Sequence, residues 1–299
     1  MKKTILSRKL NNAVQCNVCS HRCKVSLGMR GICGVRENID GVLYSLNYGK
    51  LISEALDPIE KKPFYHFLPG TQSLSIACAG CNFACGHCQN WDISQIKDHI
   101  KEDGENYRKA MPGRESKPED IVKHAKELNI PSISYTYTEP TVFAEFALDV
   151  MKLAKKENLK NAWVTNGFMT KELSDLIIPH LDAANIDLKS FSESFYKKIC
   201  KASLEPILEN IVYLKKKNIW IELTTLIIPG HNDSEEELRK IAKFIKEKVG
   251  KDTPWHVSRF SPEISYKMKE IPPTPVEIVK KAVEIGKDAG LKNVYAGNL

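Results

Sequence analysis

A short loop carries three cysteines, Cys81, Cys85 and Cys88, in the spacing C-x3-C-x2-C. The loop directly follows the apolar run 73–78, so we expect it at the carboxyl end of a strand, where α/β proteins place their chemistry. Three thiolates on one short loop can bind three corners of a [4Fe–4S] cluster and leave the fourth iron open to a small-molecule ligand. Two alternatives stand beside this: a closed zinc site with Cys78 as fourth ligand, and a redox-active dithiol.

Four further cysteines lie close together near the start of the sequence, at Cys16, Cys19, Cys23 and Cys33. Soft thiolates in this number bind either a tetrahedral zinc ion or a second [4Fe–4S] cluster, and His21 offers a spare nitrogen ligand. The segment around them is small, polar and rich in glycine, so it lacks a core of its own and needs a metal to hold its shape. On this ground the sequence slightly favours structural zinc.

Repeated strand–helix units must position the loop. Short apolar runs predict six strands, and amphipathic stretches between them predict helices. The predicted strands are 73–78, 132–137, 161–165, 184–188, 219–228 and 254–258, and the predicted helices are 117–128, 141–157, 171–179, 204–217, 234–248 and 274–289. This alternation predicts an α/β fold with a parallel sheet, specifically a partial (β/α)6 TIM-like barrel over residues 70–299. Residues 292–297 can add a seventh strand, and residues 1–69 form the N-terminal Cys-rich segment and a connector.

Composition excludes several classes of protein. The 299 residues are 42% hydrophobic, which is enough for a sizeable core and excludes intrinsic disorder. No apolar run approaches the roughly 18 residues of a membrane-spanning helix, so we expect a cytoplasmic protein without a membrane partner.

The cytoplasm keeps thiols reduced, so clustered cysteines indicate metal binding, while Cys78 and Cys200 are expected to be buried apolar residues. The polar stretch 99–116 predicts a mobile excursion after the first barrel strand.

Polar side chains follow the ends of the later predicted strands. Because the carboxyl ends of parallel strands meet at one edge of a sheet, we expect these residues to converge on the cysteine loop. They are Glu139, Thr165, Asn166, Asp187, Lys189 and His256. Each also has a simpler interpretation. Glu139 can supply negative charge at a helix N-terminus, the Asn166-Gly167 pair can form an ordinary turn, and Asp187 and Lys189 can form a buried ion pair.

Several of these motifs together resemble a known family. The C-x3-C-x2-C loop after the first strand of a partial barrel is similar to the radical S-adenosylmethionine (SAM) superfamily. Residues 80–91, Gly-Cys-Asn-Phe-Ala-Cys-Gly-His-Cys-Gln-Asn-Trp, resemble its pyruvate formate-lyase-activating-enzyme-like branch. The N-terminal cysteines, residues 31–36 and the stretch Asp57-Pro58-Ile59-Glu60-Lys61-Lys62-Pro63 resemble the radical SAM enzyme of the AmmeMemoRadiSam system. Members of that group continue past Asn298 with further cysteine pairs, so this chain is either naturally short or truncated.

The resemblance implies roles for individual residues. Cys81, Cys85 and Cys88 would ligate the cluster, and the methionine part of SAM would bind the open iron. His87 occupies the family's adenine-contacting position, and Glu139 its position for receiving the methionine amine. Lys189 would neutralise the methionine carboxylate, with Asp187, Thr165 and Asn166 helping to form the pocket. Apart from the resemblance, we expect His256 and Arg259 of the sixth predicted strand to line the cofactor or substrate side. In the family, two glycines precede the glutamate, whereas this chain has Tyr137 and Thr138, which puts a close approach of the backbone in doubt.

The implied activity is that of an enzyme. It would reductively cleave SAM and use the 5′-deoxyadenosyl radical to abstract hydrogen from an unidentified small-molecule, peptide or protein substrate, with flavodoxin or ferredoxin as electron donor. Two other functions stay open. One is activation of a glycyl-radical enzyme, and the other is a zinc-dependent nucleic-acid-binding module. The net charge of +7 is spread along the chain rather than gathered in a basic stripe, which makes a nucleic-acid partner the weaker expectation.

Overall fold

The computed structural model describes residues 1–98 and 111–299. Within them, one nine-stranded sheet runs in the order β15-β14-β13-β12-β11-β10-β8-β7-β9. Its strands are β7 (Lys50–Pro58), β8 (Gln72–Cys78), β9 (Arg114–Glu115), β10 (Ser132–Tyr135), β11 (Lys160–Thr165), β12 (Ala183–Asp187), β13 (Trp220–Ile227), β14 (Trp255–Arg259) and β15 (Val294–Gly297). The seven strands from β8 to β15, leaving out β9, pair in parallel, so the predicted strands, the additional strand near the C-terminus and the partial barrel are confirmed.

Helices occupy all six predicted places, and two further short helices, at 91–94 and 193–195, were not predicted. They are α1 (Trp91–Ser94), α4 (Pro118–Glu127), α5 (Ala144–Lys156), α6 (Lys171–Ile177), α7 (Glu193–Phe195), α8 (Glu205–Lys216), α9 (Glu235–Phe244) and α10 (Val276–Asp288). Short helical turns add η1 (Ile59–Lys61), η2 (Pro140–Phe143), η3 (Ile178–His180), η4 (Tyr196–Cys200), η5 (Ile245–Val249) and η6 (Pro262–Ile264). Apolar faces of α5, α8 and α10 pack on β11, β13 and β14, which closes the core.

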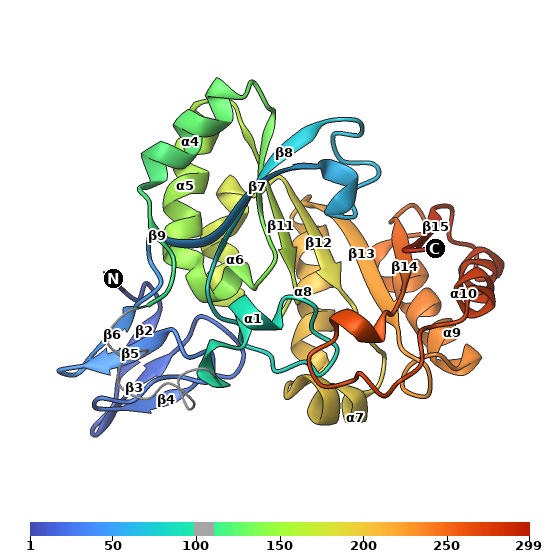
Figure 1. The fold of residues 1–299 in the computed structure, drawn as a ribbon, viewed down its shortest axis with the longest axis horizontal. Helices are drawn as coiled ribbons and strands as arrows, with labels where there is room; N and C mark the ends of the chain where they lie inside the picture. Colours follow the sequence, from blue (N-terminus) through green and yellow to red (C-terminus); the bar gives the residue numbers. More distant parts are fainter. Residues whose placement is uncertain (99–110) are drawn as a thin grey trace.

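The main sheet starts before the barrel boundary expected at residue 70. Strand β7 pairs antiparallel with β8 over most of its length, from Leu51 opposite Cys78 to Pro58 opposite Gln72. Pro58 is tolerated because it stands at the end of the strand. The connector that follows β7 therefore lies at the amino-terminal end of the parallel strands, opposite the cysteine loop (Figure 1).

The N-terminal segment forms two small sheets of its own. One has the order β1-β6-β5 and the other β2-β3-β4. Their strands are β1 (Lys2–Lys3), β2 (Ser7–Lys9), β3 (Ala13–Cys16), β4 (Lys24–Ser26), β5 (Arg36–Ile39) and β6 (Val42–Ser45). Figure 1 shows this group beside the end of the main sheet where α1 lies, which is the carboxyl end of the parallel strands. The Cys-rich segment thus docks at the edge that carries the chemistry.

A buried ion pair fastens the segment to the barrel. Arg36 of β5 donates two hydrogen bonds to the Glu145 carboxylate of α5, at 2.7 and 2.8 Å. Its guanidinium also donates to Thr4 Oγ1 at 2.9 Å and to the Val142 carbonyl at 3.2 Å. Both charged side chains are almost completely buried, so each depends on the other for compensation.

Two further expectations concern the chain as a whole. No helix within residues 1–98 and 111–299 has the length and hydrophobicity to cross a membrane. Most of the predicted excursion at 99–116 lies outside the described residues.

We predict that Glu145→Ala lowers the free energy of unfolding by about 3–5 kcal/mol, because Arg36 would stay buried without its counter-charge. Anaerobic denaturant unfolding, followed by circular dichroism, measures the change. Lys240→Ala is the control, since it breaks an exposed pair with Glu236 and should change stability by less than about 1 kcal/mol. A Glu145→Ala effect as small as that of the control would contradict the prediction.

Candidate active site

The cysteine loop between β8 and α1 is held by hydrogen bonds on both flanks. The amide of Ala84 donates to the Cys200 carbonyl at 2.9 Å, and that of Gly86 donates to the Ile199 carbonyl at 3.2 Å. On the other side the Gly86 carbonyl accepts from the amide of Lys267 at 2.8 Å. A Cβ at Gly86 would come within 3.1 Å of Met268 Cγ, so glycine allows this close approach. The loop conformation is therefore set by η4 and by the segment after η6.

The three loop thiols have the surroundings of metal ligands. Cys81 Sγ accepts a hydrogen bond from the Phe83 amide at 3.4 Å, and Cys88 Sγ lies 3.3 Å from Ser94 Oγ. Burial raises the pKa of Cys81 well above its ordinary value and that of Cys88 to about 11. Thiols in such a site become thiolates when a metal binds them, because coordination to the cation deprotonates them.

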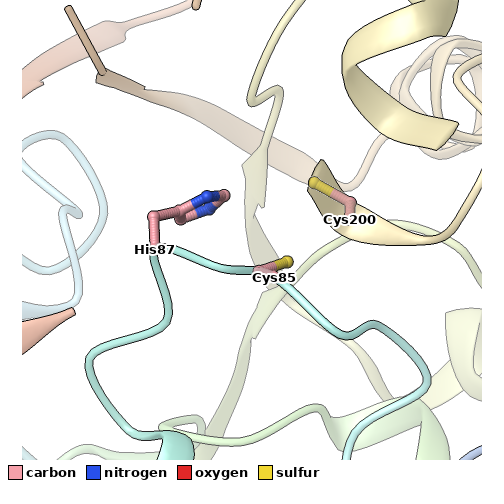
Figure 2. A group of neighbouring side chains, drawn as sticks. All are labelled: Cys85, His87 and Cys200. Atoms are coloured by element: carbon pink, nitrogen blue, oxygen red, sulfur yellow. The ribbon is translucent and has the colours of Figure 1, made fainter. Parts of the chain in front are cut away.

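One sulfur of the loop has a close neighbour outside it. Figure 2 shows Cys85 and His87 of the loop facing Cys200 at the end of η4, and the ligand atoms of all three lie within 4.8 Å of one another. A hydrogen bond with Cys200, and then burial, raises the pKa of Cys85 well above its ordinary value. We interpret Cys200 as a hydrogen-bonding neighbour of the Cys85 thiolate, because thiolates on different irons of a cubane lie farther apart than thiolates on one ion. Cys78, like Cys200, is fully buried, as expected.

His87 is an imidazole without a protein partner. Its side chain is buried, and within the described part of the chain neither ring nitrogen has a hydrogen-bond partner. Burial lowers the pKa of His87 well below its ordinary value, so the ring is neutral at physiological pH. Buried polar atoms are rarely left unpaired, which makes His87 suited to a ligand that offers a donor and an acceptor, as adenine does.

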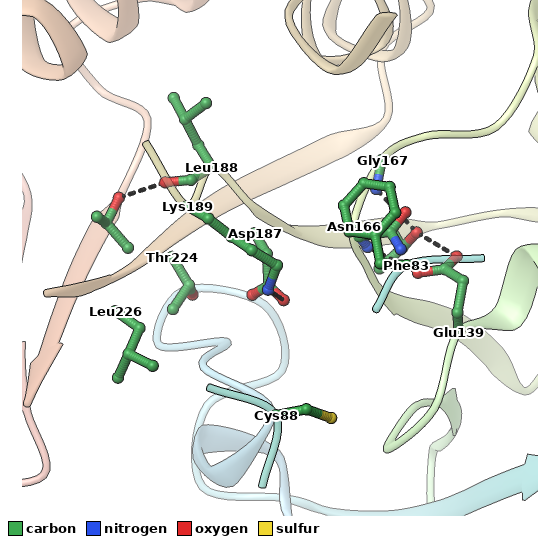
Figure 3. Close-up of polar contacts among 12 residues, drawn as sticks. Phe83, Cys88, Glu139, Asn166, Gly167, Asp187, Leu188, Lys189, Thr224 and Leu226 are labelled. Carbon is green, nitrogen blue, oxygen red and sulfur yellow. Dashed lines mark hydrogen bonds and ion pairs between the residues drawn. The ribbon is translucent and has the colours of Figure 1, made fainter. Parts of the chain in front are cut away.

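The carboxylate of Glu139 joins the ends of β10 and β11. Its Oε1 accepts hydrogen bonds from the Thr141 amide, the Thr141 hydroxyl and the Thr165 hydroxyl, at 3.0, 2.6 and 2.7 Å. Its Oε2 accepts from the Asn166 amide at 2.8 Å (Figure 3). Asn166 in turn donates through Nδ2 to Asn82 Oδ1 at 2.7 Å, which ties the end of β11 to the cysteine loop. Burial raises the pKa of Glu139.

Asp187 and Lys189 form the ion pair that the sequence left open, and they form it inside the same site. Lys189 Nζ lies 2.7 Å from Asp187 Oδ2 at the end of β12 (Figure 3). Burial alone would lower the pKa of Lys189, but the Asp187 carboxylate raises it well above its ordinary value. The ammonium therefore stays charged, and it is available to a second anion.

The turn before Glu139 contains Tyr137 and Thr138 where the family has two glycines. Tyr137 has φ +64°, so it adopts the left-handed conformation that glycine adopts easily and tyrosine rarely does. Three contacts hold it there. Its hydroxyl donates to Asp57, its ring lies 3.9 Å from Lys62 Nζ, and its carbonyl accepts from Asn90 Nδ2 at 2.8 Å. Tyr137 thus occupies, in the turn before Glu139, a conformation that glycine would adopt without strain.

His256 is committed to a structural contact. Its Nε2 lies 2.7 Å from Oε2 of the fully buried Glu222. Glu222 also accepts hydrogen bonds from the amides of Tyr65, His66 and Phe67, at 3.0, 2.9 and 3.2 Å, and these bonds hold the connector. Burial alone would raise the pKa of Glu222, but the hydrogen bond with His256 and those from the backbone lower it.

One cavity of about 510 Å³ collects these groups. Its lining includes all ten side chains that the sequence assigns to the cluster and to SAM, namely Cys81, Cys85, His87, Cys88, Glu139, Thr165, Asn166, Asp187, Lys189 and His256. The lining also includes residues that the sequence analysis did not single out for the site, among them Asn90, Gln95, Thr224 and Ser258. Asn90 lies close to the third cysteine and Ser258 at a predicted strand end, but no sequence signal marked Gln95 or Thr224. The N-terminal cysteines line a separate cavity.

Comparison with known proteins now identifies the class. Residues 75–245 match the Radical SAM superfamily. The chain is 46% identical over its whole length to an uncharacterized protein of Methanocaldococcus jannaschii, of which it covers 86%. It therefore belongs to the radical SAM superfamily, whose members use a [4Fe–4S] cluster and SAM. The chain is an enzyme, and the zinc-dependent binding module is set aside.

More specific relatives point to the activating-enzyme branch. Pyruvate formate-lyase 1-activating enzyme of Escherichia coli is 23% identical over 56% of this chain and 66% of its own length. A putative glycyl-radical enzyme activating enzyme of M. jannaschii is 26% identical over 58% of this chain and 63% of its own. This chain thus covers somewhat less than two thirds of the length of these relatives.

Solved structures agree at the level of the fold. A radical SAM methyltransferase from Sphaerobacter thermophilus has a TM-score of 0.57 at 13% identity, covering 77% of this chain and 67% of that one. SuiB from Streptococcus suis bound to S-adenosylmethionine has a TM-score of 0.56 at 12% identity, covering 73% and 48%.

We predict that Lys189→Ala weakens SAM binding by about tenfold to a hundredfold, because a charge-assisted hydrogen bond is worth about 1.5–3 kcal/mol. Calorimetric titration of the reconstituted enzyme with SAM measures the affinity, and iron content should stay at the wild-type value. Lys197→Ala, an exposed lysine paired with Glu193, is the matched control and should bind normally. Equal affinities in the two variants would remove Lys189 from the SAM site.

We also predict that Cys200→Ala retains the wild-type iron content and lowers the reduction potential of the cluster. The S–H group beside Cys85 stabilises the more negative, reduced cluster, so its loss makes reduction harder. Potentiometric titration followed by electron paramagnetic resonance gives the potential. Loss of iron from Cys200→Ala, as expected for Cys85→Ala, would instead make Cys200 a ligand.

Proposed function

We propose that this enzyme reductively cleaves SAM and abstracts hydrogen from a substrate bound inside the barrel. One observation carries the proposal. A single cavity gathers the C-x3-C-x2-C thiols, an unpartnered buried imidazole and a charged lysine, which match the parts of a cluster-bound SAM. When bound, the reduced cluster supplies one electron to the sulfonium, and the 5′-deoxyadenosyl radical that leaves takes a hydrogen atom from the substrate.

The protein's own part is to bind and orient. Cys81, Cys85 and Cys88 hold three corners of the cluster, and Lys189 compensates the methionine carboxylate. The neutral His87 pairs with the adenine. Glu139 Oε2, which accepts one hydrogen bond from within the described residues, keeps a lone pair for the methionine amine.

The substrate end of the cavity is formed by the connector. Lys61, Lys62 and Tyr65 line it from the amino-terminal end of the barrel, and Asn298 lines it from the C-terminus. Asn185 of β12 donates to the Pro63 carbonyl at 2.7 Å, so the connector is fixed across the barrel interior. Because the connector closes one end of the cavity, we expect the substrate to be a small molecule or the end of a peptide chain. A one-electron protein donor such as flavodoxin or ferredoxin supplies the reductant.

Anaerobic reconstitution with iron and sulfide tests this function. The wild-type enzyme with dithionite and SAM should release 5′-deoxyadenosine, and Cys85→Ala should not, because the cluster loses one of its three ligands. Cys78→Ala is the control, since Cys78 is buried in β8 and lies outside the cavity lining. Release by Cys85→Ala at the wild-type rate, or loss of release in Cys78→Ala, would contradict the ligand assignment.

Activation of a glycyl-radical enzyme is the second candidate, supported by the likeness to the E. coli activating enzyme. It would require a backbone glycine of a partner to enter the cavity that the connector bounds. The two candidates differ in where the unpaired electron ends. A persistent glycyl radical on an added pyruvate formate-lyase, seen by electron paramagnetic resonance, would favour this second function.

A further inference from the structure

The four N-terminal cysteines surround a cavity of their own. Cys16, Cys19, Cys23 and Cys33 all line one small, partly enclosed space. The rest of the wall includes the apolar residues Val18, Ile32 and Val142 together with polar residues, namely His21, Arg36, Asn82 and Thr141. Val18 and Val142 are almost completely buried, whereas Ile32 is exposed, so the site lies near the protein surface. The structure leaves these four thiols free, without a disulfide between them.

The spacing of the sulfurs distinguishes between zinc and a cluster. Four thiolates on one tetrahedral zinc ion, each about 2.3 Å from it, lie about 3.8 Å from one another. Throughout residues 1–98 and 111–299, Cys85, His87 and Cys200 form the one set of three such ligand atoms within 4.8 Å of each other. No three of the N-terminal sulfurs, with or without the nitrogens of His21, meet this limit. In this structure the four sulfurs stand around a common space, more widely spaced than the ligands of a single bound zinc ion.

The catalytic loop supplies an internal standard. Cys81, Cys85 and Cys88 belong to a cluster-binding motif, and their three sulfurs also fail to lie within 4.8 Å of one another. A cubane places each thiolate on a different iron at a different corner, so its ligands surround a core instead of converging on one point. The N-terminal sulfurs therefore share the wide spacing of the catalytic set.

We propose that Cys16, Cys19, Cys23 and Cys33 bind a second [4Fe–4S] cluster, ligated at all four corners. With no open iron, this cluster has no place for SAM. The backbone near Val18, His21 and Val35 lowers the pKa of Cys16, Cys19 and Cys33, although burial raises the pKa of all three thiols overall. Amide hydrogen bonds to ligand sulfurs are one of the means by which proteins set a cluster's potential.

The second site lies directly against the catalytic loop. Asn82, the residue after Cys81, lines the N-terminal cavity, and its carbonyl lies 2.8 Å from His21 Nε2. On the same side, a Cβ at Gly80 would come within 2.6 Å of Val35 Cγ1 and 3.2 Å of the Cys33 carbonyl. One layer of residues separates the two cysteine sets. Two clusters in these places would therefore be close neighbours.

The full-length variant Cys81→Ala/Cys85→Ala/Cys88→Ala isolates the second site. It would be reconstituted anaerobically with ferrous iron and sulfide in the presence of equimolar Zn²⁺, and its metals and sulfide would then be counted. We expect about four irons and four sulfides per chain, no stoichiometric zinc, and an electron paramagnetic resonance signal of a reduced [4Fe–4S] cluster after dithionite. One zinc per chain without iron would overturn the proposal, as would a variant that folds but binds neither metal.

The reciprocal variant and the wild-type enzyme complete the test. Cys19→Ala/Cys23→Ala should keep about four irons, those of the catalytic set, whereas the wild type should hold about eight. Reduced wild type should show magnetic coupling between two neighbouring clusters, and each variant should lose it. If the triple variant does not fold, the wild type decides, because four irons and one zinc per chain would overturn the proposal. Metal counting does not depend on turnover, so this result is separate from that of the SAM-cleavage assay.

Discussion

The site depends first on the buried carboxylate of Glu139. Four hydrogen bonds from Thr141, Thr165 and Asn166 converge on it, and they draw the end of β10 and the end of β11 to one point. A buried carboxylate is stable only when its lone pairs are satisfied, so these strand ends have little freedom to separate. Through Asn166 and Asn82 the same network reaches the cysteine loop. The position of the first thiolate is therefore coupled to the position of two barrel strands.

Sequence patterning was enough to predict the barrel because its strands are short, apolar and separated by amphipathic helices. Each predicted strand matches an observed one within a few residues, from 73–78 at β8 to 254–258 at β14. Strand β7 was not predicted as part of the sheet, and the reason is physical. It pairs antiparallel with β8, from which the connector separates it in the sequence. The pattern of apolar residues within one short segment does not show which other strand that segment pairs with. The Arg36–Glu145 contact, which joins residues far apart in the sequence, was hidden for the same reason.

The candidate site was predictable to the extent that it is made of strand ends. Residues such as Thr165 and Lys189 line one cavity because parallel strands end at the same edge of the sheet. The alternation of predicted strands and helices along the sequence already implied a parallel sheet. What each side chain contacts was not predictable. The sequence assigned His256 to the pocket lining, yet its imidazole is held by Glu222, a residue on the neighbouring strand β13. The left-handed turn at Tyr137 likewise depends on Asp57 and Lys62, which lie far before it in the sequence.

The segment that carries the N-terminal cysteines packs directly against the catalytic loop and its neighbours. Cys19 and Met169 form an isolated antiparallel β-bridge through their backbones, and the Ser20 amide donates a hydrogen bond to the Phe168 carbonyl at 3.0 Å. The N-terminal segment therefore packs on the loop after β11. On its other side the segment packs on Gly80, whose φ of +103° and lack of a Cβ admit Val35. A metal centre that fixed the segment would therefore also brace the start of the catalytic loop and the turn after Thr165. Because ligation orders a small segment, a metal bound there would contribute to the geometry of the active site without touching SAM.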